Sequence, residues 1–360
     1  MKKMNVAVVG ATGIAGQQFV SALADHPWFE LSRLGASTKS AGKSYADALR
    51  DSSTGQLRWW AGGAPPAAAL ELRVEEGASL DLGGVDLVFS AVESEVAAEL
   101  EPLYAQTTPV ISTASAFRYE DDVPLLLPGV SMEHAVLIKR QRETRGWKGF
   151  ILPQPNCTVT GLAITLKPIH ERFGVERVSM VSMQGISGAG RSPGVAALDA
   201  IDNVIPFIPS EEEKVAREAR KLLGRVISSS IEEADIKVSS TCTRAAVLEG
   251  HTEAVSLELS AAAGPQEVVE VLRSAGKTAA KLPLPSMPET LIRVHDDPFR
   301  PQPRLDRNAG GGMITSVGRV RGEELYRHGV KYVLVSHNTK MGAARGAILV
   351  AEYLLHKKLI

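Results

Sequence analysis

Short apolar runs alternate with amphipathic segments through the first 150 residues of the chain. Residues 6–9, 85–91 and 109–112 are largely apolar runs of strand length, residues 29–34 predict a further strand, and residues 17–24 show helical spacing. Continuous apolar runs of this length are typical of parallel strands, which are buried on both faces of a sheet. The repeated strand–helix alternation therefore predicts an α/β N-terminal domain of the doubly wound (Rossmann-like) class.

The pattern changes after residue 155. Residues 177–184, 236–248 and 254–259 form longer segments in which apolar and polar side chains alternate. Because this alternation is typical of strands with one solvent-facing side, these segments predict a mixed or antiparallel sheet. The second half of the chain is therefore expected to be an α+β domain.

Two helices are predicted in this second half. Ser210 and Glu213 have the spacing of a capping box, which predicts a helix that begins there and runs through residue 223. Residues 342–355 are rich in small side chains and predict a helix that packs closely on another element. Residues 51–84, with paired Trp, Gly and Pro, are expected to be an irregular surface excursion without an assigned function.

Composition narrows the class of protein. The chain has 360 residues, of which 44% are hydrophobic and 22% charged, and its net charge is -1. Such a chain is expected to be soluble and globular, and its near-neutral charge argues against nucleic-acid or membrane partners. Two cysteines argue against a disulfide framework and fit a reducing cytoplasm. No stretch approaches the roughly 20 apolar residues of a membrane helix, and no metal-ligand cluster is apparent.

A glycine turn separates the first predicted strand from the first predicted helix. Gly10, Gly13 and Gly16 lie where glycines let a backbone approach a pyrophosphate at a helix N-terminus. The spacing is GxxGxxG rather than the commoner GxGxxG, and tight packing of any strand–helix unit is the alternative interpretation.

The loop that follows the second predicted strand holds hydroxyls and lysines at residues 37–43. Since NAD sites usually carry an acidic residue there, this loop favours NADP over NAD, although a polar loop is common after any strand.

Cys157 is the candidate nucleophile. Pro153 and Pro155 stiffen the approach to a helix predicted to begin at Asn156 or Cys157, with Asn156 as its N-cap. A thiol in the first turn meets unpaired N–H groups and the positive end of the helix dipole, which favour the thiolate. The alternative is a buried small hydrophobe. A thiolate combined with NADP indicates oxidation of an aldehyde through a thioester.

Such a reaction needs a group that exchanges protons near neutral pH, most often histidine. His251 is one of eight histidines and lies at a predicted turn between two strands, where a side chain can face a cleft. A turn histidine that is merely exposed is the alternative interpretation. Cys242, inside a predicted strand, is expected to pack rather than react.

Several motifs recur together in the order of one known family. They are Gly10-Ala11-Thr12-Gly13, residues 37–43, Pro155-Asn156-Cys157-Thr158, Gln184 with residues 187–190, Glu211-Glu212-Glu213-Lys214, Arg244 with Gly250-His251, and His337-Asn338-Thr339. With these motifs the chain resembles the aspartate-semialdehyde dehydrogenases of the archaeal and fungal branch over almost its whole length. The resemblance implies reversible, NADP-dependent conversion of L-aspartate 4-semialdehyde and phosphate to 4-phospho-L-aspartate, in lysine, threonine and methionine biosynthesis.

The resemblance also implies roles for single residues. Cys157 is implied as the nucleophile, His251 as the general acid/base and Asn156 as the residue that holds the active-site turn. The implied substrate-binding residues are Gln184, Arg244 for the α-carboxylate, Glu211 for the amine, and Arg118 and Lys214 for phosphate. The implied cofactor contacts are Gly10, Thr12, Gly13, Ile14, Ala15, Ser37, Thr38, Ser40, Lys43, Ser90, Ser187, Gly188 and Asn338.

The resemblance further implies a domain division and an assembly. Residues 1–154 and 338–360 are expected to form the NADP-binding domain, and residues 155–337 the catalytic and dimerisation domain. A homodimer or homotetramer is expected.

One segment departs from the family pattern. Thr113 stands where the family generally has Asn, and Gly129 and Ser131 replace the Glu and Asn of a Pro-Glu-Val-Asn run. These changes leave an acyl-CoA reductase of the malonyl-CoA reductase type, or a non-catalytic NADP-binding homologue, as alternatives. The run from Glu211 to Lys214 argues against the CoA substrate, which has no amine and needs no inorganic phosphate.

Overall fold

The computed structural model of the chain describes residues 2–190 and 197–360 and divides them into two compact units. The first unit consists of the chain up to Pro124, Ala135–Gln154 and Ala347–Ile360. The second consists of Leu125–His134 and Pro155–Gly346. Residues 125–134 and 338–346, which the sequence-based division places in the first domain, therefore belong to the second unit.

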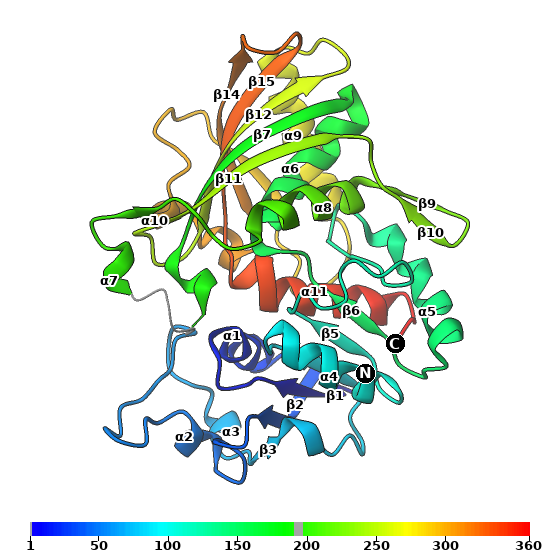
Figure 1. Cartoon of the computed structure of the whole chain (residues 1–360), viewed down its shortest axis with the longest axis vertical. Coiled ribbons are helices and arrows are strands. Elements are labelled where there is room, and N and C mark those ends of the chain that lie inside the picture. Colours follow the sequence, from blue (N-terminus) through cyan, green and yellow to red (C-terminus); the bar gives the residue numbers. More distant parts are fainter. Residues whose placement is uncertain (1, 191–196) are drawn as a thin grey trace. The chain divides into compact units, whose positions relative to one another are not determined.

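The first unit is built on a parallel sheet with the strand order β3-β2-β1-β4-β5-β6 (Figure 1). Its strands are β1 (Met4–Val9), β2 (Phe29–Ala36), β3 (Val74–Glu76), β4 (Leu87–Ser90), β5 (Val110–Ser112) and β6 (Ile151–Pro153). Its helices are α1 (Ile14–Leu23), α2 (Tyr45–Ala48), α3 (Ala67–Leu70), α4 (Ser94–Ala105), α5 (Leu137–Arg145) and nearly all of α11 (Arg345–His356). This is the strand order of a doubly wound dinucleotide-binding fold, so the predicted fold class is confirmed.

The carboxyl ends of the central strands meet at one edge of this sheet. Val9 at the end of β1 pairs with Gly35 on one side and with Ser90 on the other, and Ser90 pairs in turn with Ser112. Residues that follow these strands, which include the glycine turn, are therefore neighbours in space. The excursion over residues 51–84 was expected to be irregular, but it contains both α3 and the edge strand β3.

The last helix is anchored to the first unit by a buried polar pair. Nε2 of His26 lies 2.8 Å from Oε1 of Glu352 on α11, and both side chains are buried. Nδ1 of His26 accepts the backbone N–H groups of Trp28 and Phe29, so a neutral ring carries its proton on Nε2 and donates it to Glu352.

The second unit is built on a mixed sheet with the order β13-β14-β15-β12-β7-β11-β8 (Figure 1). Its strands are β7 (Val175–Gln184), β8 (Val204–Ile205), β11 (Lys237–Ala245), β12 (His251–Leu259), β13 (Ile292–Val294), β14 (Thr315–Glu323) and β15 (Gly329–Ser336), with a separate hairpin of β9 (Arg225–Ile227) and β10 (Ser230–Glu232). Its helices are α6 (Cys157–Phe173), α7 (Ala197–Ala200), α8 (Glu211–Leu223), α9 (Pro265–Ala279) and α10 (Pro303–Asp306). Strand β11 runs parallel to β7, whereas β12 runs antiparallel to it, which confirms the predicted mixed sheet.

Helix α6 lies against this sheet at very short range. A Cβ atom built on Gly161 would lie 2.7 Å from Cβ of Ser336 on β15, closer than Cβ atoms approach other heavy atoms in proteins. The helix can therefore approach the strand only because this position, one turn after Cys157, has no side chain.

Helix α8 has the predicted extent but a different N-terminus. Ser210 has a left-handed backbone, with φ of 55°, and its side chain makes no capping hydrogen bond. The predicted capping box is therefore wrong, because a capping side chain needs the extended backbone that Ser210 lacks. Across the described residues, we find no helix with both the length and the apolar character that membrane crossing requires.

Candidate active site

The N-terminus of α6 presents Cys157 as its first residue. Oδ1 of Asn156 accepts the backbone N–H groups of Thr158 at 2.8 Å and Val159 at 3.2 Å. These are two of the N–H groups that a helix start leaves unpaired, so the predicted N-cap is confirmed. The Cys157 side chain is partly exposed, whereas Cys242 is fully buried and burial raises the pKa of its thiol to about 11.

His251 lies beside the nucleophile. Its Nε2 is 3.3 Å from Sγ of Cys157, and its Nδ1 accepts the backbone N–H of Gly185 at 3.1 Å. Because a backbone N–H can only donate, the neutral ring must carry its proton on Nε2, the atom that faces the thiol. Burial, helped by the positive charge of Arg244, lowers the pKa of His251 to about 3.

The place of His251 differs from the expected one. It is the first residue of β12, paired with Ser336 of β15, and it is fully buried rather than exposed at a turn. His251 is buried because it pairs with a distant strand of the sheet, and a local sequence pattern does not reveal that pairing.

Arg244 and Gln184 are neighbouring residues of the site on adjacent strands. They pair directly across β11 and β7, and both side chains are buried. Nη1 of Arg244 donates to the carbonyl of Gly185 at 2.8 Å, while its Nε has no hydrogen-bond partner among the described residues. A buried guanidinium with a spare donor is a suitable partner for an anionic group of a ligand.

The carboxylate of Glu211 connects Gln184 to the N-terminus of α6. Its Oε1 accepts Thr158 Oγ1 at 2.9 Å and Gln184 Nε2 at 3.0 Å, and its Oε2 accepts Asn156 Nδ2 at 3.0 Å. A carboxylate has about four acceptor positions, so this arrangement leaves one on Oε2 for a further donor. Lys214 lies one turn later on α8 and is partly exposed.

Two buried carboxyl groups of the site escaped the sequence analysis. Oε2 of Glu218 on α8 accepts the backbone N–H of Asn156 at 2.6 Å. Its seven-residue spacing from Glu211 places both on one helix face and was the available signal. Glu253 is fully buried and neither of its oxygens has a partner among the described residues; burial and the nearby Glu211 raise its pKa. Alternation with His251 along β12 was the only signal for it.

Three of the expected cofactor residues surround His251 in the second unit. Asn338 accepts the Gly250 N–H on Oδ1 at 2.9 Å and donates from Nδ2 to Ser187 Oγ at 2.9 Å. A Cβ built on Gly188 would lie 2.9 Å from Arg244 Nη1 and 3.3 Å from His251 Cε1. The glycine at this position therefore leaves room for both side chains.

The remaining expected cofactor residues lie at the carboxyl edge of the parallel sheet. Gly10 has φ of 78°, and a Cβ there would lie 2.3 Å from the carbonyl oxygen of Ala91; a Cβ on Gly16 would lie 2.1 Å from the carbonyl oxygen of Gly10. Helix α1 starts after Gly13 without a side-chain cap, so its first N–H groups are available to an anion. Thr12, Ile14 and Ala15 belong to the same turn. These features fit a dinucleotide phosphate.

The loop after β2 and Ser90 at the end of β4 share this edge. Ser37, Thr38 and Lys43 are exposed, Ser40 is partly exposed, and residues 37–43 contain no carboxylate. This charge pattern fits a 2′-phosphate better than a free 2′-hydroxyl.

Arg118 is held by its own unit. Its Nε donates to the Gln154 carbonyl at 2.8 Å and its Nη2 to the Thr113 carbonyl at 3.0 Å. Thr113, the first departure from the family pattern, donates from Oγ1 to the Ser90 carbonyl at 3.3 Å.

The other two departures have structural partners in the second unit. Ser131 Oγ donates to the Leu125 carbonyl at 2.9 Å, inside its own loop. A Cβ on Gly129 would lie 2.7 Å from Cδ1 of Leu291. Packing within the second unit therefore accounts for both residues.

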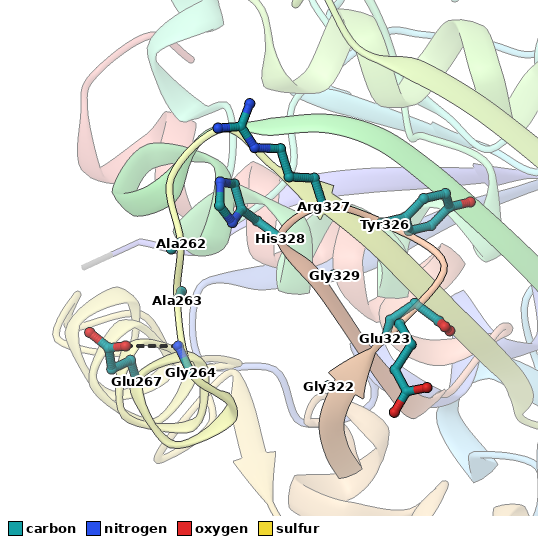
Figure 2. A pocket seen from close by; sticks show the side chains of 11 residues that line it. Ala262, Ala263, Gly264, Glu267, Gly322, Glu323, Tyr326, Arg327, His328 and Gly329 are labelled. Atoms are coloured by element: carbon teal, nitrogen blue, oxygen red, sulfur yellow. Dashed lines mark hydrogen bonds between the residues drawn. The ribbon is translucent and has the colours of Figure 1, made fainter.

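An open hollow of about 560 Å³ lies elsewhere in the second unit (Figure 2). It is bordered by the β14–β15 hairpin and the residues before α9, where the Gly264 N–H donates to Glu267 at 2.7 Å. It lies at the end of β15 opposite Ser336, and none of the predicted site residues lines it. No group of three or more His, Cys, Asp or Glu within residues 2–190 and 197–360 has the arrangement of a metal site.

Two family descriptions match the sequence. "Semialdehyde dehydrogenase, NAD binding domain" matches residues 5–138, and "Semialdehyde dehydrogenase, dimerisation domain" matches residues 166–341. The aspartate-semialdehyde dehydrogenase of Archaeoglobus fulgidus is 44% identical over 362 aligned residues, which cover 99% of this chain and 100% of that protein. That of Candida albicans is 39% identical and both chains are covered completely.

Solved structures show the same likeness. The crystal structure of aspartate-semialdehyde dehydrogenase with NADP from Candida albicans superposes with a TM-score of 0.87 at 37% identity, covering 99% of this chain and 100% of that one. Aspartate-semialdehyde dehydrogenase II from Vibrio cholerae, complexed with ASA, gives 0.76 at 26% identity and 99% of each chain. The similarity extends over the whole chain rather than over one unit.

Proposed function

This chain belongs to the semialdehyde dehydrogenase family, and from that membership we propose that it is an NADP-dependent aspartate-semialdehyde dehydrogenase. In this proposal it converts L-aspartate 4-semialdehyde, phosphate and NADP⁺ reversibly to 4-phospho-L-aspartate and NADPH, in the cytoplasm, as a step of lysine, threonine and methionine biosynthesis. The observation that carries the proposal is the 3.3 Å contact between Cys157 Sγ and His251 Nε2, next to the buried guanidinium of Arg244.

Cys157 is the nucleophile in this mechanism. Its thiolate attacks the aldehyde carbon, which forms a C–S bond and leaves negative charge on the aldehyde oxygen. Bound NADP⁺ would accept the hydride that the carbon must lose for a thioester to form on Sγ. Phosphate then attacks that carbonyl, the C–S bond breaks, and Cys157 leaves as a thiolate.

His251 handles the charge on the substrate oxygen. The expected role was general acid/base, and the tautomer fixed by the Gly185 N–H defines how it acts: Nε2 holds the proton and presents it to Sγ and then to the oxygen. A hydrogen-bond donor held in position stabilises a developing oxyanion without rearrangement. Asn156 contributes by fixing the start of α6.

The substrate is held at its amino-acid end. Arg244 pairs with the α-carboxylate through its spare Nε and a terminal nitrogen, the bidentate geometry that guanidinium favours. Glu211 accepts the amine at its remaining acceptor position, and Gln184 orients Glu211. Lys214 binds phosphate from the first turn of α8. Arg118 has the same proposed role.

The cofactor is held by the two units separately. In the first unit, the N-terminus of α1 and the glycine turn bind the pyrophosphate, and the loop of residues 37–43 binds the 2′-phosphate. Ser90, which is buried at the end of the neighbouring strand β4, is a further proposed contact. In the second unit, Ser187, Gly188 and Asn338 are the proposed contacts.

We also propose that the chain is a homodimer or homotetramer. On the sheet face away from α6, Val181 of β7 pairs with Ala254 of β12, which pairs with Val333 of β15. Val181 is 43% exposed, and Ala254 is exposed. An apolar row across three strands favours burial against a second copy. Val181→Lys should lower the mass measured by light scattering after size exclusion, whereas an unchanged mass argues against this interface.

A substrate comparison tests the activity. Wild-type protein with the semialdehyde and NADP⁺ should form NADPH only when phosphate or arsenate is present. The reverse reaction should oxidise NADPH with 4-phosphoaspartate and not with malonyl-CoA. Phosphate-independent activity that requires coenzyme A would overturn the proposal in favour of the acyl-CoA reductase. Absence of activity with both acyl donors would favour the non-catalytic homologue.

A further inference from the structure

Two carboxyl groups on α8 face the N-terminus of α6. Glu211 and Glu218 are seven residues apart, with the buried Val215 between them on the same helix face. Glu211 accepts hydrogen bonds from the side chains of Asn156 and Thr158, as described above. Glu218 accepts a hydrogen bond from the backbone N–H of Asn156 at 2.6 Å, and its side chain is fully buried.

This contact completes the hydrogen bonding of Asn156. Its Oδ1 accepts two helix N–H groups, its Nδ2 donates to Glu211, and its carbonyl accepts the backbone N–H of Thr160 at 2.9 Å. The backbone N–H is the one group that the helix and Glu211 do not engage. Glu218 engages it from another element, so the backbone of Asn156, which precedes Cys157, is held at both its N–H and its carbonyl.

We propose that Glu218 is a positioning residue for Cys157, a role that rests on the proposed function for its catalytic consequence. Glu218 holds the N-cap residue and so holds Sγ at its 3.3 Å distance from His251. A displacement of about 1 Å at a reacting atom can cost on the order of 10²-fold in rate, so this anchor affects the reaction without touching the substrate. What matters in this role is the acceptor oxygen at position 218 rather than its charge.

Glu218→Gln and Glu218→Met separate these two properties. Both variants lack the charge and have a similar length, but only Gln keeps an acceptor oxygen for the Asn156 N–H. Glu213→Gln, on the exposed side of the same helix, is the matched control. Each variant is assayed for kcat and KM, for melting temperature, and for the pH dependence of Cys157 alkylation by iodoacetamide.

We expect E218Q to keep kcat within about fivefold of wild type, and E218M to lose about 10- to 100-fold in kcat with a much smaller change in KM. The alkylation midpoint of E218M should lie at least about half a pH unit above that of E218Q, because a displaced thiolate loses the Nε2–H donor. E213Q should match wild type in both measurements.

Equal kcat values and equal alkylation midpoints for folded E218Q and E218M would overturn the proposal, as would a loss in E218Q as large as that in E218M. If E218M does not fold, Glu218→Asp replaces it: the carboxylate retreats by one methylene, so the same rise in midpoint relative to E218Q is expected. Alkylation needs no substrate, so it tests the positioning role separately from the proposed function. If wild type fails the phosphate-dependent assay but the variants show the expected difference in alkylation midpoint, only the proposed function is refuted.

Discussion

Sγ of Cys157 lies 3.3 Å from Nε2 of His251, and the Gly185 N–H on the far side of the ring places the imidazole proton between them. The pair is thus arranged so that Sγ accepts a hydrogen bond from a neutral imidazole. Burial lowers the pKa of His251 to about 3, so this ring stays neutral through the whole range in which the protein is expected to work. The pH dependence of the reaction should therefore follow the thiol and not the imidazole.

Replacing the nucleophile should abolish the chemistry without affecting the fold. Cys157→Ser is expected to lower kcat by at least about 10³-fold, because an alcohol at this site is not ionised. Cys242→Ala should stay within about threefold of wild type, since that thiol only packs. Mass spectrometry after limited iodoacetamide treatment should find the label on Cys157. Labelling of Cys242 instead would contradict the assignment.

A methyl group on Gly188 should disturb two site residues at once. The new Cβ would lie 2.9 Å from Arg244 Nη1 and 3.3 Å from His251 Cε1, so both side chains must shift. We expect Gly188→Ala to reduce kcat/KM by about 10- to 100-fold while the melting temperature changes little. Gly322→Ala is the control, because a Cβ there meets no atom within 4 Å. Equal kcat/KM for the two variants would show that this packing is not required.

Lys43 should contribute to cofactor choice. Lys43→Glu places a negative charge where the 2′-phosphate is proposed to bind, so kcat/KM for NADP should fall by at least about tenfold. The value for NAD, which lacks that phosphate, should change by less than about threefold. Lys139→Glu, whose parent side chain is 84% exposed on α5, controls for net charge. Parallel losses with both cofactors would place the 2′-phosphate elsewhere.

Glu101 should make stability depend on pH. It is fully buried, accepts Ser112 Oγ at 2.5 Å, and burial raises its pKa from 4.5 to about 7. The folded state therefore holds a proton that the unfolded state releases between these values, so the free energy of unfolding falls as pH rises through this window. The loss approaches about 3 kcal/mol at pH 8.

Urea unfolding of wild type and Glu101→Gln between pH 5 and 8 measures this effect. The difference in stability between them should favour the variant increasingly as pH rises, because the amide never ionises. Glu99→Gln, exposed on the same helix, should follow wild type. Parallel curves for wild type and E101Q would contradict the shifted pKa.

The features that were predictable from sequence are those encoded locally. Apolar runs on both faces predicted the parallel strands, alternation predicted the mixed sheet, and Asn156 before an apolar helical pattern predicted the N-cap. Strand β3 escaped because Val74 is the only apolar residue of this short edge strand, whose neighbour β2 lies far away in sequence.

Contacts between distant segments set the rest of the site. The inward position of His251 follows from its pairing with Ser336, and its tautomer follows from a backbone group of Gly185. Glu218 reaches a residue 62 positions away, and its seven-residue spacing from Glu211 places it on the same helix face but does not reveal this partner. The failed capping box at Ser210 has a similar cause, since spacing alone does not specify the backbone angle.

Gly161 sets how deeply the nucleophile helix can settle onto its sheet. Even a methyl group there would clash with Ser336, so helix α6 and its first residue, Cys157, would have to move away from the sheet. Saturation mutagenesis should therefore find that residue 161 tolerates no replacement, although it is not proposed to contact substrate or nucleotide. A ranking of positions by mutational tolerance alone would mistake such a residue for a ligand contact.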